Sequence, residues 1–214
     1  MKGIQLVIVG FCMGILSLGC QVPIPVNETE KLWKDCKLEN LLPFEVFQIA
    51  LKGFHRMDSI RKNNILTIID YSKPSSEKRF FVIDIQNKAL LHSTFVAHGK
   101  NSGENMAVSF SNEQNSLQSS IGFFITGETY TGENGYSMKL DGLEKGINDN
   151  ARSREIVIHG ADYVSEEYIS KYGRLGRSWG CPALPRELSK EIIDLISNGT
   201  CLLIYSKDYK QNSL

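Results

Sequence analysis

The feature that most constrains the fold is a series of short runs of β-branched and aromatic residues between Ile65 and Tyr205. Polar turn sequences rich in Ser, Pro, Asn and Gly separate these runs, a pattern typical of an antiparallel sheet. We predict strands over residues 65–71, 79–85, 89–97, 121–127, 136–140, 156–158 and 201–205. The second of these runs is apolar nearly throughout, which indicates a sheet covered on both faces.

Helical periodicity predicts four helices, over residues 28–37, 43–61, 165–172 and 185–197. In the second helix, Phe47, Leu51 and Phe54 recur at three- and four-residue spacing and form an apolar stripe. Ser165 is a predicted cap for the third helix, and Pro185 is a suitable first residue for the fourth. The sequence therefore predicts an α+β fold with mainly antiparallel strands, an N-terminal helical segment and a helix near the C-terminus.

Composition agrees with one globular domain, because 42% of the 214 residues are hydrophobic and 22% are charged. The formal net charge is zero, and Lys and Arg are scattered along the chain without forming a block. Nucleic acid is held mainly by concentrated positive charge. We therefore expect no nucleic-acid partner.

The N-terminus has the pattern of an export signal. A nearly unbroken apolar run over residues 4–16 follows a single lysine and leads to Ser17-Leu18-Gly19-Cys20. Such a segment is typical of a secretory signal peptide and is too short for a confident membrane span. The position of Cys20 directly after Gly19 resembles a bacterial lipoprotein cleavage box, which predicts a lipid anchor on Cys20. Ordinary cleavage and an uncleaved anchor are the alternatives.

Export makes disulfides possible, so the remaining cysteines matter. Without the signal peptide and Cys20, three are left: Cys36, Cys181 and Cys201. Cys201 lies in an apolar run and Cys36 in an amphipathic segment, which predicts that both are plain buried residues. Cys181, between Gly180 and Pro182, has no such packing explanation, so it is a candidate nucleophile. A disulfide from Cys181 to Cys36 or Cys201 is the alternative.

His159 is the candidate base for this cysteine. A nucleophilic cysteine needs a nearby base and some positive potential. His159 ends the predicted strand 156–158, and Gly160 leaves room for a substrate or a second segment. His98 also precedes a glycine at a strand end, and so it is an alternative base or a substrate contact.

Three features predict positive potential around Cys181. The helix that begins at Pro185 offers the partial positive charge of its first amides. Arg174 and Arg177 precede the cysteine closely. They either bind an acidic group or hold the loop, or they are solvated loop charges. The amides of Gly180 and Cys181 are candidate donors for an oxyanion hole.

These residues carry a family resemblance. His159-Gly160 followed by Ser178-Trp179-Gly180-Cys181 resembles the His-Gly…Ser-x-Gly-Cys signature of the L,D-transpeptidase (YkuD-type) catalytic domain family. Residues 176–185 are similar to the branch with Gly-Arg-Ser-x-Gly-Cys-Pro-Ala-Leu-Pro. The resemblance covers residues 41–205 and implies the β-sandwich described for this family.

The resemblance also implies roles for individual residues. Cys181 attacks the peptide stem of peptidoglycan and forms a thioester, while His159 transfers the proton and is oriented by the carbonyl of Gly160. Ser178 has a structural or a substrate-contacting role. The other substrate contacts that we expect are those of Trp179, which either packs structurally or lines the pocket, and of Arg177, Arg174 and His98. No cofactor and no metal are implied.

We therefore expect an exported cysteine acyltransferase that catalyses L,D-transpeptidation in the periplasm or cell envelope. An L,D-carboxypeptidase, in which water resolves the same thioester, is the close alternative. A non-catalytic lipoprotein that binds the cell wall is another, and a metal-dependent amidase using His98, His159 and Cys181 is a third. The amidase lacks the usual ligand spacing of metal sites.

The predicted domain boundaries follow from these assignments. They are a signal peptide over 1–20, a tether and short helix over 21–40, the catalytic domain over 41–207 and a tail over 208–214. Within the catalytic domain, residues 99–120 are polar and rich in Ser, Asn and Gly. This segment is either an ordered loop over the site or a flexible insertion.

Overall fold

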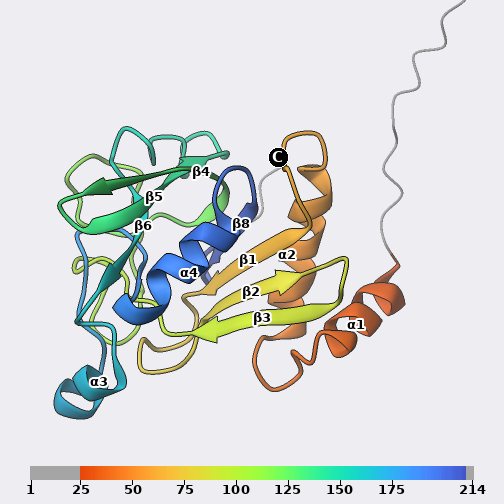
Figure 1. The fold of residues 1–214 in the computed structure, drawn as a ribbon, viewed down its shortest axis with the longest axis horizontal. Coiled ribbons are helices and arrows are strands. Elements are labelled where there is room, and N and C mark those ends of the chain that lie inside the picture. The colour runs from red at the N-terminus through yellow and green to blue at the C-terminus, as the bar shows by residue number, and fades with distance from the viewer. Residues whose placement is uncertain (1–24, 211–214) are drawn as a thin grey trace, which may run out of the picture.

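The computed structural model describes residues 25–210, which contain four helices and eight strands (Figure 1). The predicted signal peptide, the lipidation site Cys20 and the last four residues lie outside the described residues. Between residues 25 and 210, no helix combines the length and the apolar character needed to cross a membrane.

All eight strands belong to one mixed sheet. In chain order they are β1 Ile65–Asp70, β2 Phe80–Asp84, β3 Ala89–Thr94, β4 Gly122–Gly132, β5 Gly135–Gly142, β6 Val157–Ala161, β7 Ala183–Pro185 and β8 Cys201–Tyr205. Their order in the sheet is β3-β2-β1-β8-β4-β5-β6-β7. Only β1 with β8 and β6 with β7 are parallel among the described pairs. The predicted α+β class is confirmed, with one continuous sheet instead of the two sheets of a sandwich.

The two edges of the sheet meet beyond β3. Ala97 and Ala183 form an antiparallel bridge, in which each backbone amide donates to the other residue's carbonyl, at 2.8 and 3.3 Å. A second bridge joins Gly99 to Ser178. The sheet therefore nearly closes into a barrel. The sequence did not predict β7, because its three residues include no β-branched side chain.

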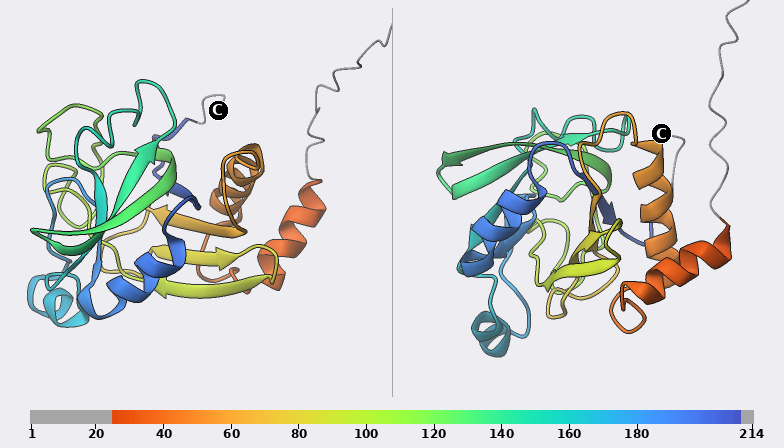
Figure 2. Two further views of the ribbon diagram at one scale, coloured as in Figure 1. Left: turned by 45° about the horizontal axis from the view of Figure 1, so that its top comes forward. Right: turned by 45° about the vertical axis from the view of Figure 1, so that its right-hand side comes forward.

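The two N-terminal helices lie on one side of this sheet and the last helix lies on the other (Figure 2). Their bounds are α1 Val26–Asp35, α2 Phe44–Arg56, α3 Glu166–Tyr172 and α4 Arg186–Ile196. All four were predicted, although α2 ends earlier than the apolar pattern indicates. The cap of α3 is also confirmed, since Ser165 Oγ accepts a hydrogen bond from the Tyr168 amide at 3.1 Å.

The two larger of three hydrophobic cores fill the space between helices and sheet. Alternate residues of β2 face them: Phe81 and Ile83 pack on the side of α2, and Phe80 and Val82 on the other side. The second core also contains three isoleucines of α4, namely Ile192, Ile193 and Ile196. Each fully buried side chain of this kind contributes about 1.5–3 kcal/mol by leaving water. The prediction that β2 is covered on both faces is confirmed.

Candidate active site

His159 lies in the middle of β6, between β5 and β7. Its Cα atom is paired with those of Ser137 and Ala183. Its backbone amide donates to the carbonyl oxygen of Pro182 at 3.4 Å. Because Pro182 directly follows Cys181, the sheet holds the backbone of the predicted base next to the segment that carries the predicted nucleophile. The structure thus brings together two residues that are 22 positions apart in the sequence.

The imidazole of His159 is buried, with 4% of the residue exposed. Its Nδ1 atom lies 3.2 Å from the carbonyl oxygen of Gly160. When Nδ1–H donates to this carbonyl, Nε2 is unprotonated and can accept a proton. Burial lowers the pKa of His159, and the Arg186 guanidinium lowers it further, against the effect of the Gly160 hydrogen bond. The ring is therefore neutral at neutral pH, as a general base must be.

Gly160 has a second role, in packing. A Cβ atom at this position would lie 2.4 Å from Ser189 Oγ and 3.2 Å from Arg186 Cα. Both residues belong to α4, so the absence of a side chain lets this helix sit directly on β6. The sequence predicted that Gly160 leaves room either for a substrate or for a second segment, and the structure shows the second of these.

Cys181 contacts the chain that enters β6. Its thiol donates to the Glu155 carbonyl and its sulfur accepts from the Val157 amide, each at 3.5 Å. Within residues 25–210, these are the hydrogen bonds that Sγ makes, and neither involves His159. Burial raises the thiol pKa, while the Val157 amide and the Arg154 charge lower it. A protonated resting thiol follows, and such a thiol needs a base.

The side chain of Ser178 fixes the turn before Cys181. Its Oγ donates to the Cys181 carbonyl at 2.6 Å and accepts from the Gly180 amide at 3.1 Å. The predicted oxyanion donors therefore differ: the Gly180 amide is already bonded, whereas the Cys181 amide has no acceptor among the described residues. Ser178 has the structural role that the sequence left as one of two possibilities.

Gly180 is required by close packing. Its φ is 131°, in the region that favours glycine, and a Cβ would lie 2.8 Å from the Gln118 carbonyl oxygen. Ser119 Oγ donates to the Gly180 carbonyl at 3.0 Å and accepts from the Gly99 amide at 2.9 Å. Residues 99–120 are thus an ordered loop against the cysteine turn, which was one of the two alternatives.

Arg174 and Arg177 are both held by one carboxylate, that of Glu104. Arg174 Nε lies 3.0 Å from Glu104 Oε2, and Arg177 Nη1 lies 2.7 Å from Oε1. Arg177 also donates to the carbonyls of Lys100 and Gly103. Both arginines therefore hold the loop. Glu104 could not be found from the sequence, because it lies 70 or more residues away in a polar loop.

His98 is not placed to contact a substrate or to act as the base, contrary to the prediction. The residue is 0% exposed, and Arg79 Nη2 lies 2.8 Å from Nδ1 and the Gly103 carbonyl 3.3 Å from Nε2. Burial, with the nearby Arg79 charge, lowers its pKa to about 3. Arg79 is itself fully buried and donates to the carbonyls of Val96 and Lys73. This pair supports the loop from beneath.

Trp179 projects from the turn into solvent. It is 76% exposed, and Lys100 Nζ lies 5.9 Å from its ring centroid. The predicted alternative in which Trp179 packs structurally is therefore wrong. An aromatic face beside the nucleophile remains available to a substrate.

The other cysteines do not block Cys181. Cys36 and Cys201 are buried, and all three described cysteines are free. The disulfide alternative is therefore wrong. Within the described part of the chain, no three His, Cys, Asp or Glu side chains are grouped as metal ligands would be. His98, His159 and Cys181 thus do not form the ligand set of the amidase alternative.

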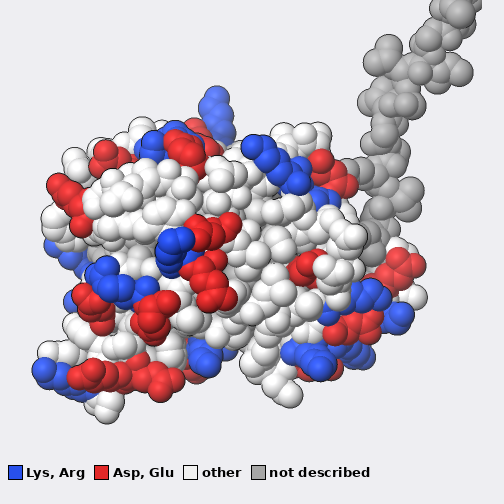
Figure 3. Space-filling view, in the orientation of Figure 1, with Lys and Arg blue, Asp and Glu red and all other residues white. Residues whose placement is uncertain are grey.

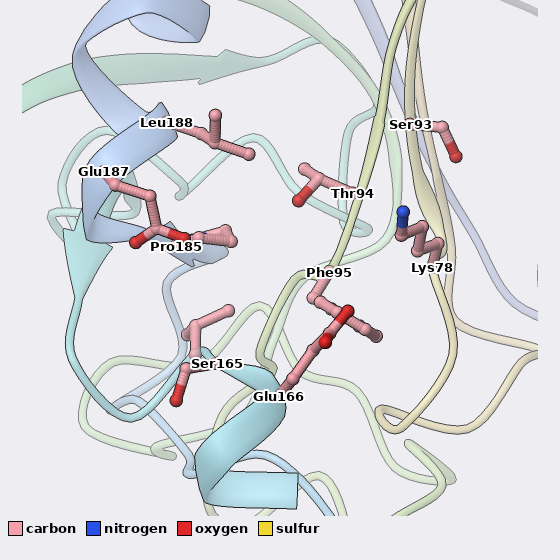
Figure 4. Close-up of a pocket in the computed structure, with 10 residues that line it drawn as sticks. Lys78, Ser93, Thr94, Phe95, Ser165, Glu166, Pro185, Glu187 and Leu188 are labelled. Carbon is pink, nitrogen blue, oxygen red and sulfur yellow. The ribbon is translucent and has the colours of Figure 1, made fainter.

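A pocket of about 320 Å³ lies elsewhere, at the far end of β7 from Cys181 (Figure 4). Its walls come from the end of β3 and the starts of α3 and α4, with Phe95, Glu166 and Leu188 among its residues. It contains none of the predicted site residues.

Charges of both signs are interleaved on the face that Figure 3 shows. Several are paired, such as Lys190 with Asp194 on α4 at 2.6 Å. Capture of a polyanion needs a field of one sign, and this face does not provide one.

Comparison with solved structures gives low similarity to L,D-transpeptidases. The one from Mycobacterium smegmatis has 13% identity over 67% of this chain and 59% of that chain, with a TM-score of 0.41. Those from Xylanimonas cellulosilytica and Enterococcus faecium have 13% and 15% identity, each over 67% of this chain and over 61% and 50% of theirs, with TM-scores of 0.37 and 0.38. The chain thus spans about half to three fifths of these proteins.

Sequence comparison is more decisive. No curated protein matches the chain. Residues 38–205, however, match the family model of the L,D-transpeptidase catalytic domain. This match covers most of the sequence and includes every residue of the site described above. The chain therefore belongs to the L,D-transpeptidase catalytic domain family.

Proposed function

We propose that this protein is an exported cysteine acyltransferase that acts on peptidoglycan stem peptides by L,D-transpeptidation. The observation that carries the proposal is the position of His159. Its Nδ1 atom faces the Gly160 carbonyl at 3.2 Å, which leaves Nε2 as a base on the strand next to the Cys181 turn. Family membership supports the reaction class.

The first half-reaction forms a thioester. The sulfur of Cys181 attacks the carbonyl carbon between an L-centre and the terminal D-residue of a donor stem, and the thiol proton passes to His159 Nε2. The unpaired Cys181 amide donates to the oxygen on which negative charge develops. When the C–N bond breaks, His159 returns the proton to the departing amine.

The second half-reaction releases the thioester. An acceptor amine attacks the thioester carbonyl and gives a proton to His159, and the C–S bond breaks as the new amide forms. The sulfur then recovers the proton from His159. If water attacks instead, the product is a shortened stem, and the protein acts as an L,D-carboxypeptidase.

The thiol must change its partner before the reaction. In the resting structure it donates to the Glu155 carbonyl. Proton transfer to His159 therefore requires rotation about the Cα–Cβ bond of Cys181 or one bridging water. Substrate that displaces the thiol from Glu155 would start the reaction.

The proposal includes attachment to the cell envelope. Residues 1–20 support export, and Cys20 supports a lipid anchor at the membrane. The domain would then act on stem peptides from the membrane surface. Mass spectrometry of the mature N-terminus tests this part separately.

The activity is tested with a purified tetrapeptide muropeptide. Cross-linked dimers, or exchange of the terminal D-residue for an added D-amino acid, are expected for the wild type and not for Cys181→Ala. If tripeptides are the only products, the activity is hydrolysis and not transpeptidation. No product, together with an unimpaired cellular role of Cys181→Ala, would favour a non-catalytic lipoprotein.

A further inference from the structure

Arg154 has an unusual environment close to Cys181. Its Nη1 atom donates to the Ser111 carbonyl and to Ser120 Oγ, the latter at 2.5 Å. Its Nη2 atom donates to Ser116 Oγ at 3.0 Å and to the Gln118 carbonyl at 2.8 Å. All four acceptors belong to the loop 99–120. The guanidinium is thus fixed by neutral oxygen atoms.

No carboxylate within residues 25–210 forms an ion pair with Arg154; Glu113 acts on it only at longer range. Arg152, two residues earlier, is different, because it pairs with Glu128 at 3.0 Å and with Asp141. Arg174 and Arg177 share Glu104. Among the described residues, Arg79 also has no bonded acid, but it contacts His98. Arg154 is the arginine without a bonded acid whose charge acts on Cys181.

Two short paths connect Arg154 to Cys181. On the loop side, the Gln118 carbonyl that accepts from Arg154 packs against Gly180, where a Cβ would lie 2.8 Å away. On the strand side, Glu155 follows Arg154 and has a φ of 57°, which is uncommon for a residue with a side chain. This conformation presents the Glu155 carbonyl to the thiol at 3.5 Å. Arg154 therefore anchors both the loop segment at Gln118 and the strand segment at Glu155 that surround the cysteine.

The other titratable groups around the thiol supply no positive charge. Glu155 carries a negative charge that disfavours the thiolate. Burial raises the pKa of Tyr71 and of Tyr163 to about 12, so both phenols are neutral. Burial keeps His159 neutral as well. The helix α4 begins only at Arg186, beyond β7, so its first amides are separated from Cys181 by a strand.

We infer that Arg154 is the positioning residue of Cys181 and the cation that favours its thiolate. The inference rests on the proposed function, in which Cys181 is the nucleophile. The four hydrogen bonds hold the guanidinium in place, and the missing acid leaves its charge to act on the sulfur. The two arginines that the sequence suggested for this role share the single carboxylate of Glu104. The charge that acts on the Cys181 thiol is that of Arg154.

The test is the pH dependence of Cys181 alkylation by iodoacetamide, followed by peptide mapping. An opposite charge nearby lowers a pKa by about 1–3 units when buried and less when screened. We expect Arg154→Gln to raise the midpoint by about one unit and Arg154→Lys to leave it within about 0.3 units of wild type. Arg152→Gln, the matched control, should not move it. A merely structural role of Arg154 would change the folding but not the midpoint.

Equal midpoints for Arg154→Gln and wild type would overturn the inference. If circular dichroism shows that Arg154→Gln does not fold, Arg154→Lys is the deciding variant. It keeps the positive charge, so a rise of one unit in its alkylation midpoint would also overturn the inference. Turnover of the tetrapeptide muropeptide separates the two proposals. If the wild type is active and Arg154→Gln has the wild-type midpoint, only the role of Arg154 is refuted. If the wild type is inactive but Arg154→Gln has a raised midpoint, the proposed function is refuted.

Discussion

The Oγ atom of Ser178 donates a hydrogen bond of 2.6 Å to the carbonyl oxygen of Cys181. The same atom accepts from the Gly180 amide at 3.1 Å. One hydroxyl therefore closes the turn that ends in the nucleophile. The Gly180 amide is therefore not free for a substrate, whereas the Cys181 amide has no acceptor within residues 25–210.

Replacing Ser178 by Ala should lower turnover of the tetrapeptide stem by between about 10- and 100-fold, since a small displacement of a nucleophile has effects of this size. The cause is the loss of both bonds that fix the turn. Steady-state kinetics measures the effect. Ser153→Ala is the matched control, because within residues 25–210 Ser153 Oγ bonds only to the exposed Asn150 carbonyl. Unchanged turnover would show that the backbone alone fixes Cys181.

Replacing Glu104 by Gln should raise KM more than it lowers kcat. The change releases Arg174 and Arg177 from their shared carboxylate and loosens residues 100–104. Because Glu104 is exposed, the free energy of unfolding should change by less than about 1 kcal/mol. Kinetics and urea unfolding measure the two effects, with Asp35→Asn, which breaks an exposed pair with Lys88, as the control. A large loss of stability with normal KM would contradict this role.

The elements that were predictable from the sequence are those with local patterns. The stripe of Phe47, Leu51 and Phe54 predicted α2, and the nearly continuous apolar run of β2 predicted its burial between two cores. The motif around Cys181 pointed to the candidate site because its residues are close in sequence. His159 could be added because the β-branched run before it is a local pattern, although β6 continues to Ala161 and the histidine does not end the strand as predicted.

What could not be predicted depends on contacts between distant segments. The bridge of Ala97 with Ala183 closes the sheet, and no local pattern marks either residue. The carboxylate of Glu104 and the two arginines meet only after the loop folds over. Burial also decided the role of His98, since the same histidine at a surface would have been a reasonable base.

The stability of the protein should fall as the pH decreases from about 6.5. Burial and the Arg79 charge lower the pKa of His98 to about 3, whereas in the unfolded chain it is about 6.5. The unfolded state therefore binds a proton that the native state does not. Between these values the loss approaches 1.4 kcal/mol per pH unit.

Urea unfolding of His98→Gln at pH 7 and pH 5 tests this prediction. The variant should lose less free energy of unfolding than the wild type over this interval, even if it is less stable at both values. His92→Gln, a change on β3 where His92 lies 3.5 Å from Glu191, is the control. An identical pH dependence in wild type and His98→Gln would refute the role of buried His98.

Turnover should rise with pH through the titration of His159. Burial lowers the pKa of this group below the value of about 6.5 that is usual for histidine. Only the neutral ring accepts the thiol proton, so kcat/KM is low below that pKa and rises above it. A pH profile of kcat/KM measures the midpoint. A rising limb centred above pH 7 would mean that another group is the base.

The central claim is that Cys181 and His159 act as nucleophile and base, and acylation tests it most directly. A carbapenem, a β-lactam that opens on thiol attack, should give a covalent adduct that peptide mapping by mass spectrometry places on Cys181. This adduct is expected on the wild type and not on Cys181→Ala, and its formation should be slowed by at least about 100-fold in His159→Ala. The absence of an adduct on every cysteine of the wild type, or undiminished formation in His159→Ala, would contradict the account.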